Sequence, residues 1–139
     1  MKFLVLNGPN LNLLGKREPG VYGTGTYAGL CAEIAAYAAA RGIRADIRQS
    51  NHEGVLIDEI QAADGVYDGI VINPGAYTHY SYAIYDALLA VRVPAVEVHI
   101  SDISRREAFR RTSVTAPACR GQIVGHGFRG YLEAMELLE

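Results

Sequence analysis

The sequence predicts an α/β fold in which a parallel β-sheet is covered by helices on both faces. Short apolar runs of strand length alternate along the chain with longer stretches of helical period, and this alternation is typical of such sheets. The chain has 139 residues, of which 50% are hydrophobic, and this is enough for one domain with its own core. We therefore expect a single domain over residues 1–139, without a linker, an internal repeat or a low-complexity segment.

Runs of apolar or alternating residues predict the strands. They lie at Lys2–Asn7, Ile43–Gln49, Gly69–Asn73, Ala95–Ile100 and Gln122–Val124. The first, third and fourth runs are almost entirely aliphatic, as expected of strands that are buried on both faces. The second run alternates apolar residues with charged ones, which favours a position at the edge of the sheet.

Helical periodicity fills the intervals between the strands. Thr26 is a suitable N-cap for the first helix, and Gly42 and Gly65 stand where glycines commonly end helices. The predicted helices lie at about Tyr27–Arg41, Gly54–Asp64, Ser81–Val91, Arg105–Arg110 and Phe128–Leu138. Right-handed crossovers through these helices most simply give a doubly wound, flavodoxin-like sheet with five strands in the order 2-1-3-4-5.

Composition excludes several classes of function. The net charge of −2 gives no electrostatic footprint for a nucleic acid or an anionic membrane. No apolar run approaches membrane-spanning length and no secretory signal pattern is present, so we expect a cytoplasmic protein. Cys31 and Cys119 are far apart and have no cysteine or histidine partner at ligand spacing, which indicates neither a zinc site nor a disulfide framework.

The predicted topology also indicates where a ligand should bind. In such sheets the ligand site lies beyond the carboxyl ends of the strands, at the point where the strand order reverses, here between the first and third strands. Asn7 and Asn73 end these two strands, and Glu97 and His99 lie at the end of the fourth. The loop after the first strand reads NGPNLNLLGKREPGVYG over residues 7–23, and it is unusually polar for a turn of this kind. We therefore place the candidate active site at this rim.

Tyr22 in this loop is a candidate general base. A phenol with a pKa of about 10 becomes a useful base only when a cation stabilises its phenolate. Arg17, five residues earlier in the same loop, can supply that charge, because a guanidinium remains protonated at any working pH. The alternative is a tyrosine that packs the loop and an arginine on the surface.

His99 is a candidate general acid. Glu97 stands two positions earlier on the same face of the strand, where its carboxylate can orient the imidazole and favour the protonated form. The alternative is a structural histidine at the end of a strand.

His79 and two asparagines offer further polar groups. His79 lies in the turn that opens the third helix, where an imidazole and free backbone N–H groups can bind a polar or anionic ligand, or simply cap the helix. Asn12 and Asn73 provide neutral amides that can hold an enolate oxygen or a hydroxyl group, although asparagine is also a common turn residue. The convergence of these residues at one rim is what indicates a site.

Other functions would require sequence motifs that can be looked for in this chain. The chain has no P-loop and no GxSxG nucleophile elbow, which argues against P-loop enzymes and hydrolases. Lys2 and Lys16 are the only lysines, and neither position favours Schiff-base chemistry. The alternative that remains is a non-catalytic flavodoxin-like module that binds a flavin or a partner protein. A flavin site would need a phosphate-cradling turn after the first strand, where this chain has Asn-Gly-Pro-Asn.

Five blocks of sequence resemble the type II 3-dehydroquinate dehydratases over essentially the whole chain. They are NGPNLNLLGKREPGVYG at 7–23, RQSNHEG at 48–54, INPGAYTHYSYAI at 72–84, EVHISDISRREAFRRTSV at 97–114 and GQIVGHGFRGYLEA at 121–134. The resemblance implies a flavodoxin-like catalytic domain that assembles as a dodecamer, a tetramer of trimers. It also implies the trans elimination of water from 3-dehydroquinate, through an enolate, to give 3-dehydroshikimate without a cofactor or a metal.

The same resemblance assigns roles to individual residues. Tyr22 matches the base that removes a proton beside the ketone, Arg17 the cation that activates it, and His99 the acid that protonates the departing hydroxyl, with Glu97 behind it. Asn12 matches the residue that holds the water stabilising the enolate. The positions that bind the hydroxyls and the carboxylate of the substrate are matched by Asn73, His79, Ile100, Ser101, Arg110 and, from a neighbouring subunit, Asp86.

Three further expectations accompany this assignment. Residues from about Gly15 to Gly25 are expected to close over the site as a lid. The arginines beside Arg110 are interpreted as a solvated helix face; they are Arg105, Arg106 and Arg111. Tyr85 and Gly75 depart from the residues of many relatives, and we expect these departures to affect subunit contacts rather than the acid and the base.

Overall fold

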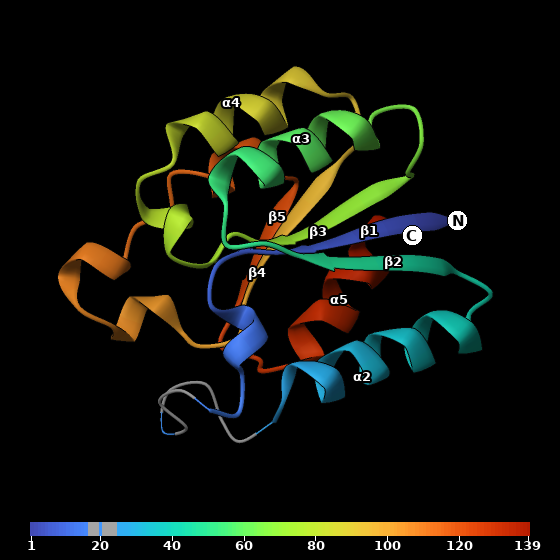
Figure 1. Cartoon of the computed structure of the whole chain (residues 1–139), viewed down its shortest axis with the longest axis horizontal. Coiled ribbons are helices and arrows are strands. Elements are labelled where there is room, and N and C mark those ends of the chain that lie inside the picture. Colours follow the sequence, from blue (N-terminus) through green and yellow to red (C-terminus); the bar gives the residue numbers. More distant parts are fainter. Residues whose placement is uncertain (17–19, 21–24) are drawn as a thin grey trace.

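A five-stranded parallel sheet forms the centre of the molecule (Figure 1). The computed structural model describes residues 1–16, 20 and 25–139. The strands are β1 (Lys2–Asn7), β2 (Arg44–Gln49), β3 (Gly69–Asn73), β4 (Ala95–His99) and β5 (Gly121–Val124). Their order is β2-β1-β3-β4-β5, which confirms the predicted topology and the edge position of the second strand.

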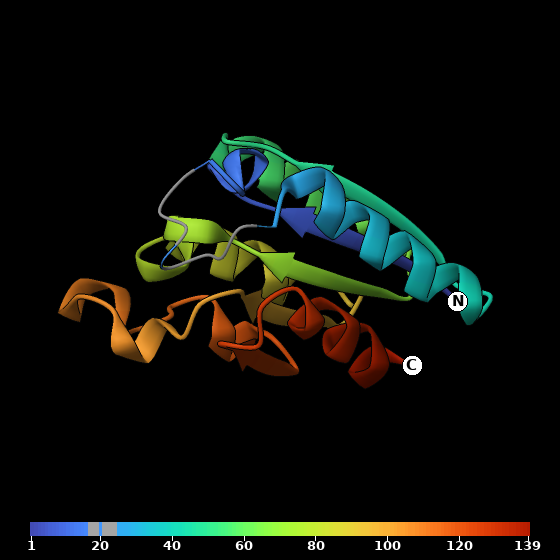
Figure 2. The same cartoon turned by 90° about the horizontal axis from the view of Figure 1, so that it is seen from below.

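Helices cover both faces of this sheet, as predicted. They are α2 (Tyr27–Ala40), α3 (Glu53–Ala63), α4 (Tyr82–Ala90) and α5 (Arg129–Leu138). Figure 1 shows α3 and α4 on one face and α2 and α5 on the other, and Figure 2 shows α2 and α5 in front of the sheet when it is viewed from their side. Thr26 caps α2 by accepting a hydrogen bond from the backbone N–H of Gly29 at 3.0 Å. Gly42 and Gly65 follow α2 and α3 with φ angles of 67° and 75°, in the left-handed region that favours glycine.

The core consists of two apolar layers, one on each side of the sheet, because successive side chains of a strand point to opposite faces. In β1, Phe3 and Val5 pack in the layer that contains residues of α2 and α5. Leu4 and Leu6 pack in the layer that contains residues of α3 and α4. All four side chains are buried. This two-sided burial fixes the direction and the end point of the strand that leads into the candidate site.

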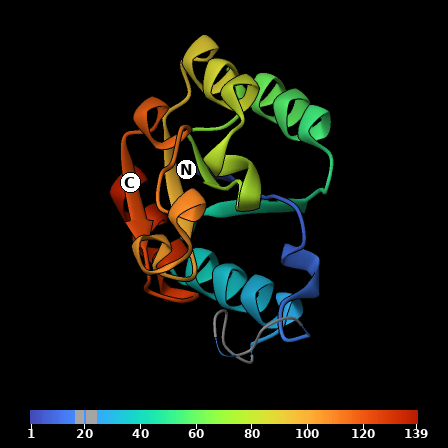
Figure 3. The same cartoon turned by 90° about the vertical axis from the view of Figure 1, so that its left-hand side faces the viewer.

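The predicted helix at Arg105–Arg110 is wrong. The segment forms two short 3₁₀ turns, Ile103–Arg105 and Ala108–Arg110, with extended backbone at Arg106 between them. Asp102 caps the first turn by accepting hydrogen bonds from both the backbone N–H and the hydroxyl of Ser104. A helix of six residues forms too few hydrogen bonds to offset the free-energy cost of nucleation, unless an apolar face packs against the rest of the protein. In Figure 3, which faces the carboxyl ends of the strands, this orange segment lies across the sheet end.

None of the helices in the described part of the chain combines the length and the apolar character needed to cross a membrane.

Candidate active site

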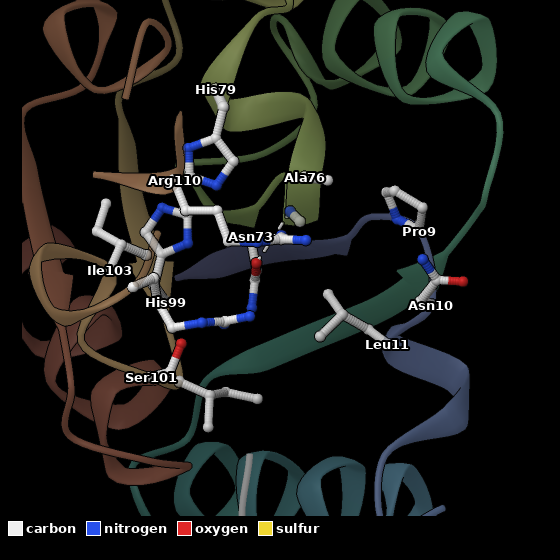
Figure 4. Close-up of a pocket in the computed structure, with 13 residues that line it drawn as sticks. Pro9, Asn10, Leu11, Asn73, Ala76, His79, His99, Ser101, Ile103 and Arg110 are labelled. Carbon is white, nitrogen blue, oxygen red and sulfur yellow. Dashed lines mark hydrogen bonds between the residues drawn. The ribbon is translucent and has the colours of Figure 1, made fainter. Parts of the chain in front are cut away.

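A pocket of about 120 Å³ lies at the carboxyl ends of β1, β3 and β4, where the topology predicts a ligand site. Its lining comes from three segments, residues 9–11, 73–79 and 99–110. Figure 4 shows Pro9, Asn10 and Leu11 along one wall, with His79 and His99 on the opposite side. The pocket therefore brings together polar groups that are far apart in the sequence.

The turn after β1 forms the first wall. The backbone N–H of Gly8 donates to the carbonyl oxygen of Asn73 at 2.8 Å, which holds this turn against the end of β3. Asn10 adopts a φ of 68°, a left-handed conformation that asparagine tolerates. Its backbone N–H donates to Oδ1 of Asn51 at 3.1 Å. These bonds fix the wall before any ligand is bound.

Asn12 follows this wall in the 3₁₀ turn Leu11–Leu13. Leu11 and Leu14 are buried in the core and anchor the turn, while Asn12 between them is exposed. Asn12 is not one of the residues that line the pocket. Its predicted contact with a water molecule at the enolate stays a prediction.

Glu97 and His99 form a buried pair at the end of β4. Nε2 of His99 lies 2.9 Å from Oε2 of Glu97, and the two side chains are 6% and 0% exposed. The same Nε2 lies 3.5 Å from the hydroxyl of Thr78. Within the described part of the chain, Nδ1 of His99 makes no hydrogen bond, and His99 lines the pocket. One ring nitrogen is thus held by the protein and the other is available to a ligand.

Glu97 accepts further hydrogen bonds from three neighbours. The hydroxyl of Ser113 and the amide of Gln122 donate to Oε2 at 2.7 and 2.8 Å, and the hydroxyl of Thr115 donates to Oε1. Burial raises the pKa of Glu97, but the hydrogen bonds from His99, Thr115 and Ser113 and the charge of His99 together outweigh it, so that the pKa lies below its ordinary value. Glu97 is therefore a carboxylate at neutral pH, and it stabilises a positive charge on the adjacent imidazole.

His79 presents its ring differently. Its Nδ1 donates to the backbone carbonyl of Thr112 at 2.8 Å, which leaves Nε2 for a ligand. Burial lowers the pKa of His79, and the nearby positive charges of His99 and Arg110 lower it further, against the opposing effect of the Thr112 carbonyl. A neutral His79 with a proton on Nδ1 can accept a hydrogen bond from a substrate hydroxyl at Nε2.

Asn73 and the residues after β4 complete the polar lining. Asn73 is 3% exposed and lines the pocket, and its amide is fixed by Tyr131 and Gly75. Ile100 and Ser101, which directly follow β4, also line the pocket. These three residues were predicted to bind substrate, and the fold places them together.

Arg110 also lines the pocket, at the end of the second 3₁₀ turn. Its Nε lies 2.9 Å from Oε2 of Glu107, and its guanidinium lies over the ring of Phe109 at 4.9 Å from the centroid. The guanidinium therefore brings a positive charge to the pocket, close to the exposed carboxylate of Glu107.

Of the remaining predicted site residues, one lies away from the pocket and two are not described by the structure. Asp86 is exposed on α4, away from the pocket of its own chain. Arg17 and Tyr22 lie outside the described residues, as does most of the predicted lid. Their roles stay predictions.

Arg106 lines the pocket, although its position in the sequence was interpreted as part of a solvated helix face. Its side chain is only 15% exposed. The extended backbone at Arg106 interrupts the two 3₁₀ turns and removes the helix face on which that interpretation depended. The length of the segment could have indicated this, because six residues rarely form a stable α-helix by themselves.

A metal site needs several ligands in one place. Among the residues that the structure describes, no group of three or more His, Cys, Asp or Glu side chains is arranged to hold a metal ion.

Comparisons with known proteins agree over the full chain. A family model described as "Dehydroquinase class II" matches residues 1–139. The chain is 57% identical to the 3-dehydroquinate dehydratase of Clostridium acetobutylicum over 139 residues, which cover 100% of this chain and 96% of that protein. Its fold is similar to the crystal structure of the type II dehydroquinase of Butyrivibrio crossotus, with a TM-score of 0.98, 55% identity and coverage of 99% and 97% of the two chains. For the type II dehydroquinase of Propionibacterium acnes the TM-score is 0.95, with 43% identity and coverage of 99% and 94%. On this evidence the chain belongs to the class II dehydroquinase family.

Proposed function

We propose that this chain removes water from 3-dehydroquinate in the pocket at the carboxyl ends of β1, β3 and β4. As a member of its family it is a hydro-lyase of the shikimate pathway. The observation that supports this site best is the buried pair of Glu97 and His99, of which His99 lines the pocket. Membership of this family favours the dehydratase over a non-catalytic flavin-binding or partner-binding module.

The elimination needs an acid, because hydroxide is a poor leaving group. Glu97 holds one nitrogen of the His99 ring and stabilises the imidazolium, and the other nitrogen delivers its proton to the departing hydroxyl. After the transfer the ring is neutral and keeps the proton that it shares with Glu97. The carboxylate thus orients the acid without taking part in the proton transfer.

The elimination also needs a base and a group that stabilises the enolate. In this proposal Tyr22, as a phenolate beside the Arg17 guanidinium, removes the proton on the carbon next to the ketone. Asn12 holds the water that stabilises the enolate oxygen. Both assignments rest on the resemblance of the loop sequence to the family pattern.

Binding of the substrate falls to the remaining polar lining. Nε2 of a neutral His79 and the amide of Asn73 suit the ring hydroxyls. The carboxylate suits the backbone and hydroxyl that follow β4 at Ile100 and Ser101, and Arg110 adds a complementary charge. The proposal needs no cofactor.

The test is an assay of the purified protein with 3-dehydroquinate, followed through the ultraviolet absorbance of the conjugated enone product. A parallel sample is treated with borohydride in the presence of substrate, which would trap a Schiff base on a lysine. We expect turnover that borohydride does not affect. A folded sample without turnover would overturn the proposed activity, and inactivation by borohydride with a covalent adduct on a lysine would overturn the mechanism.

We further propose that the chain works as a homo-oligomer, a dodecamer built from four trimers, in which Asp86 reaches the site of a neighbouring subunit. Asp86 is exposed on α4, and Tyr80, Tyr82 and Leu89 on and beside that helix are 60%, 69% and 56% exposed. Exposed apolar side chains around a charged residue suit a subunit contact. Light scattering of the purified protein measures the mass, and a monomer with full activity would contradict this part of the proposal.

A cytoplasmic location completes the proposal. Cys31 and Cys119 are free thiols, which suits a reducing compartment. Fractionation of the cells that produce the protein tests the location, and activity confined to a secreted or membrane fraction would overturn it.

A further inference from the structure

Tyr131 connects the ends of two central strands from within the core. It lies on α5, its side chain is fully buried, and its hydroxyl lies 2.7 Å from Oδ1 of Asn7 and 2.9 Å from Nδ2 of Asn73. Asn7 and Asn73 are neighbours in the register of β1 and β3, and they end these strands. The hydroxyl of Tyr131 therefore lies where the strand order reverses, directly behind the pocket.

The chemistry of these groups fixes the direction of each hydrogen bond. A phenol has one proton, and Oδ1 of Asn7 can only accept, so Tyr131 donates to Asn7. The amide nitrogen of Asn73 can only donate, so Tyr131 accepts from Asn73. Burial raises the pKa of Tyr131 well above its ordinary value, which keeps the phenol neutral and this arrangement intact.

A second contact confirms the orientation of the Asn73 amide. Its Oδ1 accepts a hydrogen bond from the backbone N–H of Gly75 at 3.1 Å, which the amide nitrogen could not do. With both ends of the amide held, one N–H of Nδ2 has no partner among the residues that the structure describes. Asn73 lines the pocket, and Figure 4 shows its side chain beside those of His79, His99 and Arg110.

We propose that Tyr131 is a positioning residue, which acts through Asn73 by fixing its amide so that the remaining N–H is presented to a hydroxyl of the substrate. The inference rests on the proposed role of Asn73 in substrate binding. Phenylalanine would fill the same space, but it would leave the Nδ2 group of Asn73 and Oδ1 of Asn7 without their buried partner. The amide of Asn73 could then turn toward other partners, and part of its contact with the substrate would be lost.

The experiment is a double-mutant cycle on KM and kcat. Tyr131→Phe is expected to raise KM roughly five- to tenfold with a smaller change in kcat, because a hydrogen bond made equally in the bound and reacting states affects binding alone. In the Asn73→Ala background the same substitution is expected to add less than about twofold, because the amide through which it acts is absent. A role in stability alone would lower the unfolding midpoint without this coupling.

Tyr27→Phe is the matched control. The hydroxyl of Tyr27 lies 3.4 Å from Nδ2 of Asn7, so this variant also loses one phenol oxygen beside Asn7 but leaves Asn73 fully held. Its KM is expected to remain within about twofold of the original value. A tenfold rise in the control would show that any loss beside Asn7 disturbs the site, and it would overturn the inference.

The outcomes separate the inference from the proposed function. If Asn73→Ala leaves KM unchanged, the substrate role of Asn73 is wrong and the inference falls with it, while the dehydratase activity stands. If Asn73→Ala raises KM but Tyr131→Phe does not, or if the two effects simply multiply, only the inference is overturned. Should circular dichroism show that Tyr131→Phe does not fold, Asn7→Ala replaces it in the cycle, because it removes the acceptor that holds the hydroxyl and is expected to raise KM in the same coupled way.

Discussion

Nε2 of His99 lies 2.9 Å from Oε2 of Glu97, and Ser113, Thr115 and Gln122 donate further hydrogen bonds to that carboxylate in the core. A second histidine and glutamate pair lies on the surface, where Nδ1 of His126 is 2.7 Å from Oε2 of Glu133 with side chains 55% and 34% exposed. The two pairs have similar distances but different surroundings. Only the buried pair opens into the pocket.

This difference gives the first prediction. His99→Asn is expected to lower kcat by a factor of about 10² to 10⁴, because the amide cannot protonate the departing hydroxyl. His126→Asn is the matched control, and its kcat is expected to stay close to the original. Steady-state assays with 3-dehydroquinate measure both, and a His99→Asn enzyme that kept most of its kcat would remove His99 as the acid.

The carboxylate of Glu97 predicts how the fold responds to acid. Its pKa in the folded protein is lowered from 4.5, so the stability that it contributes is fully present above about pH 4.5 and is lost as the pH falls through the lower folded value. Glu97→Gln removes this contribution, so the variant is expected to lose less stability than the original protein between about pH 5 and pH 3. Urea unfolding across this range measures the two slopes. Glu136→Gln, which changes an exposed carboxylate on α5, should follow the original curve, and a Glu97→Gln curve parallel to it would contradict the prediction.

Tyr22→Phe tests the proposed base. The variant has no hydroxyl to ionise, so we expect near-total loss of activity with the fold retained. Circular dichroism checks the fold, and Tyr37→Phe, which removes a hydroxyl that contacts Glu139 at the surface, serves as the control. Substantial turnover by folded Tyr22→Phe would exclude Tyr22 as the base.

Arg17→Ala tests how the base is activated. Without the guanidinium, the phenol of Tyr22 loses the charge that stabilises its phenolate, so we expect a large loss of rate and an optimum displaced to higher pH. The measurement is kcat across a range of pH. Arg129→Ala, which removes an exposed arginine from α5, should keep the original profile. A rate loss without displacement of the optimum would mean that Arg17 binds the substrate instead.

The strands and their ends could be predicted well from the sequence, because a strand buried on both faces is an almost continuous aliphatic run. The aliphatic runs that became β1, β3 and β4 end at Asn7, Asn73 and His99, which are buried polar residues at the carboxyl ends of the strands. This is why the position of the candidate site followed from topology alone. The ends of parallel strands meet at one edge, whatever lies between them in the sequence.

The side chains behind the site were harder to predict because their meaning depends on three-dimensional contacts. In the sequence, Ser113 and Thr115 are ordinary turn residues. Only the fold shows that their hydroxyls donate hydrogen bonds to Glu97 on β4. Tyr131 did carry a signal, since Tyr131, Ala134, Met135 and Leu138 recur at the spacing of a buried helix face, and a buried tyrosine needs a partner for its hydroxyl. The sequence could not say that this partner would be Asn73.

The last prediction concerns the junction of the two walls of the pocket. A Cβ atom on Gly8 would lie 2.4 Å from the carbonyl oxygen of Pro74, so Gly8→Ala must push apart the turns that follow β1 and β3. The same movement strains the hydrogen bond from Gly8 to the carbonyl of Asn73, which is 2.8 Å long. We expect a loss of about 1–3 kcal/mol in the free energy of unfolding, together with a lower kcat/KM, because Asn73 is displaced with the turn.

Gly54→Ala is the control for this substitution. A Cβ atom on Gly54 has no neighbour within 4 Å, and the residue lies in α3, where alanine favours the helix. Gly54→Ala should therefore be as stable as the original protein or more stable, with unchanged kcat/KM. Urea unfolding and steady-state assays of both variants decide the matter. If Gly8→Ala matched Gly54→Ala in both measurements, the close approach of the two turns would not constrain the site.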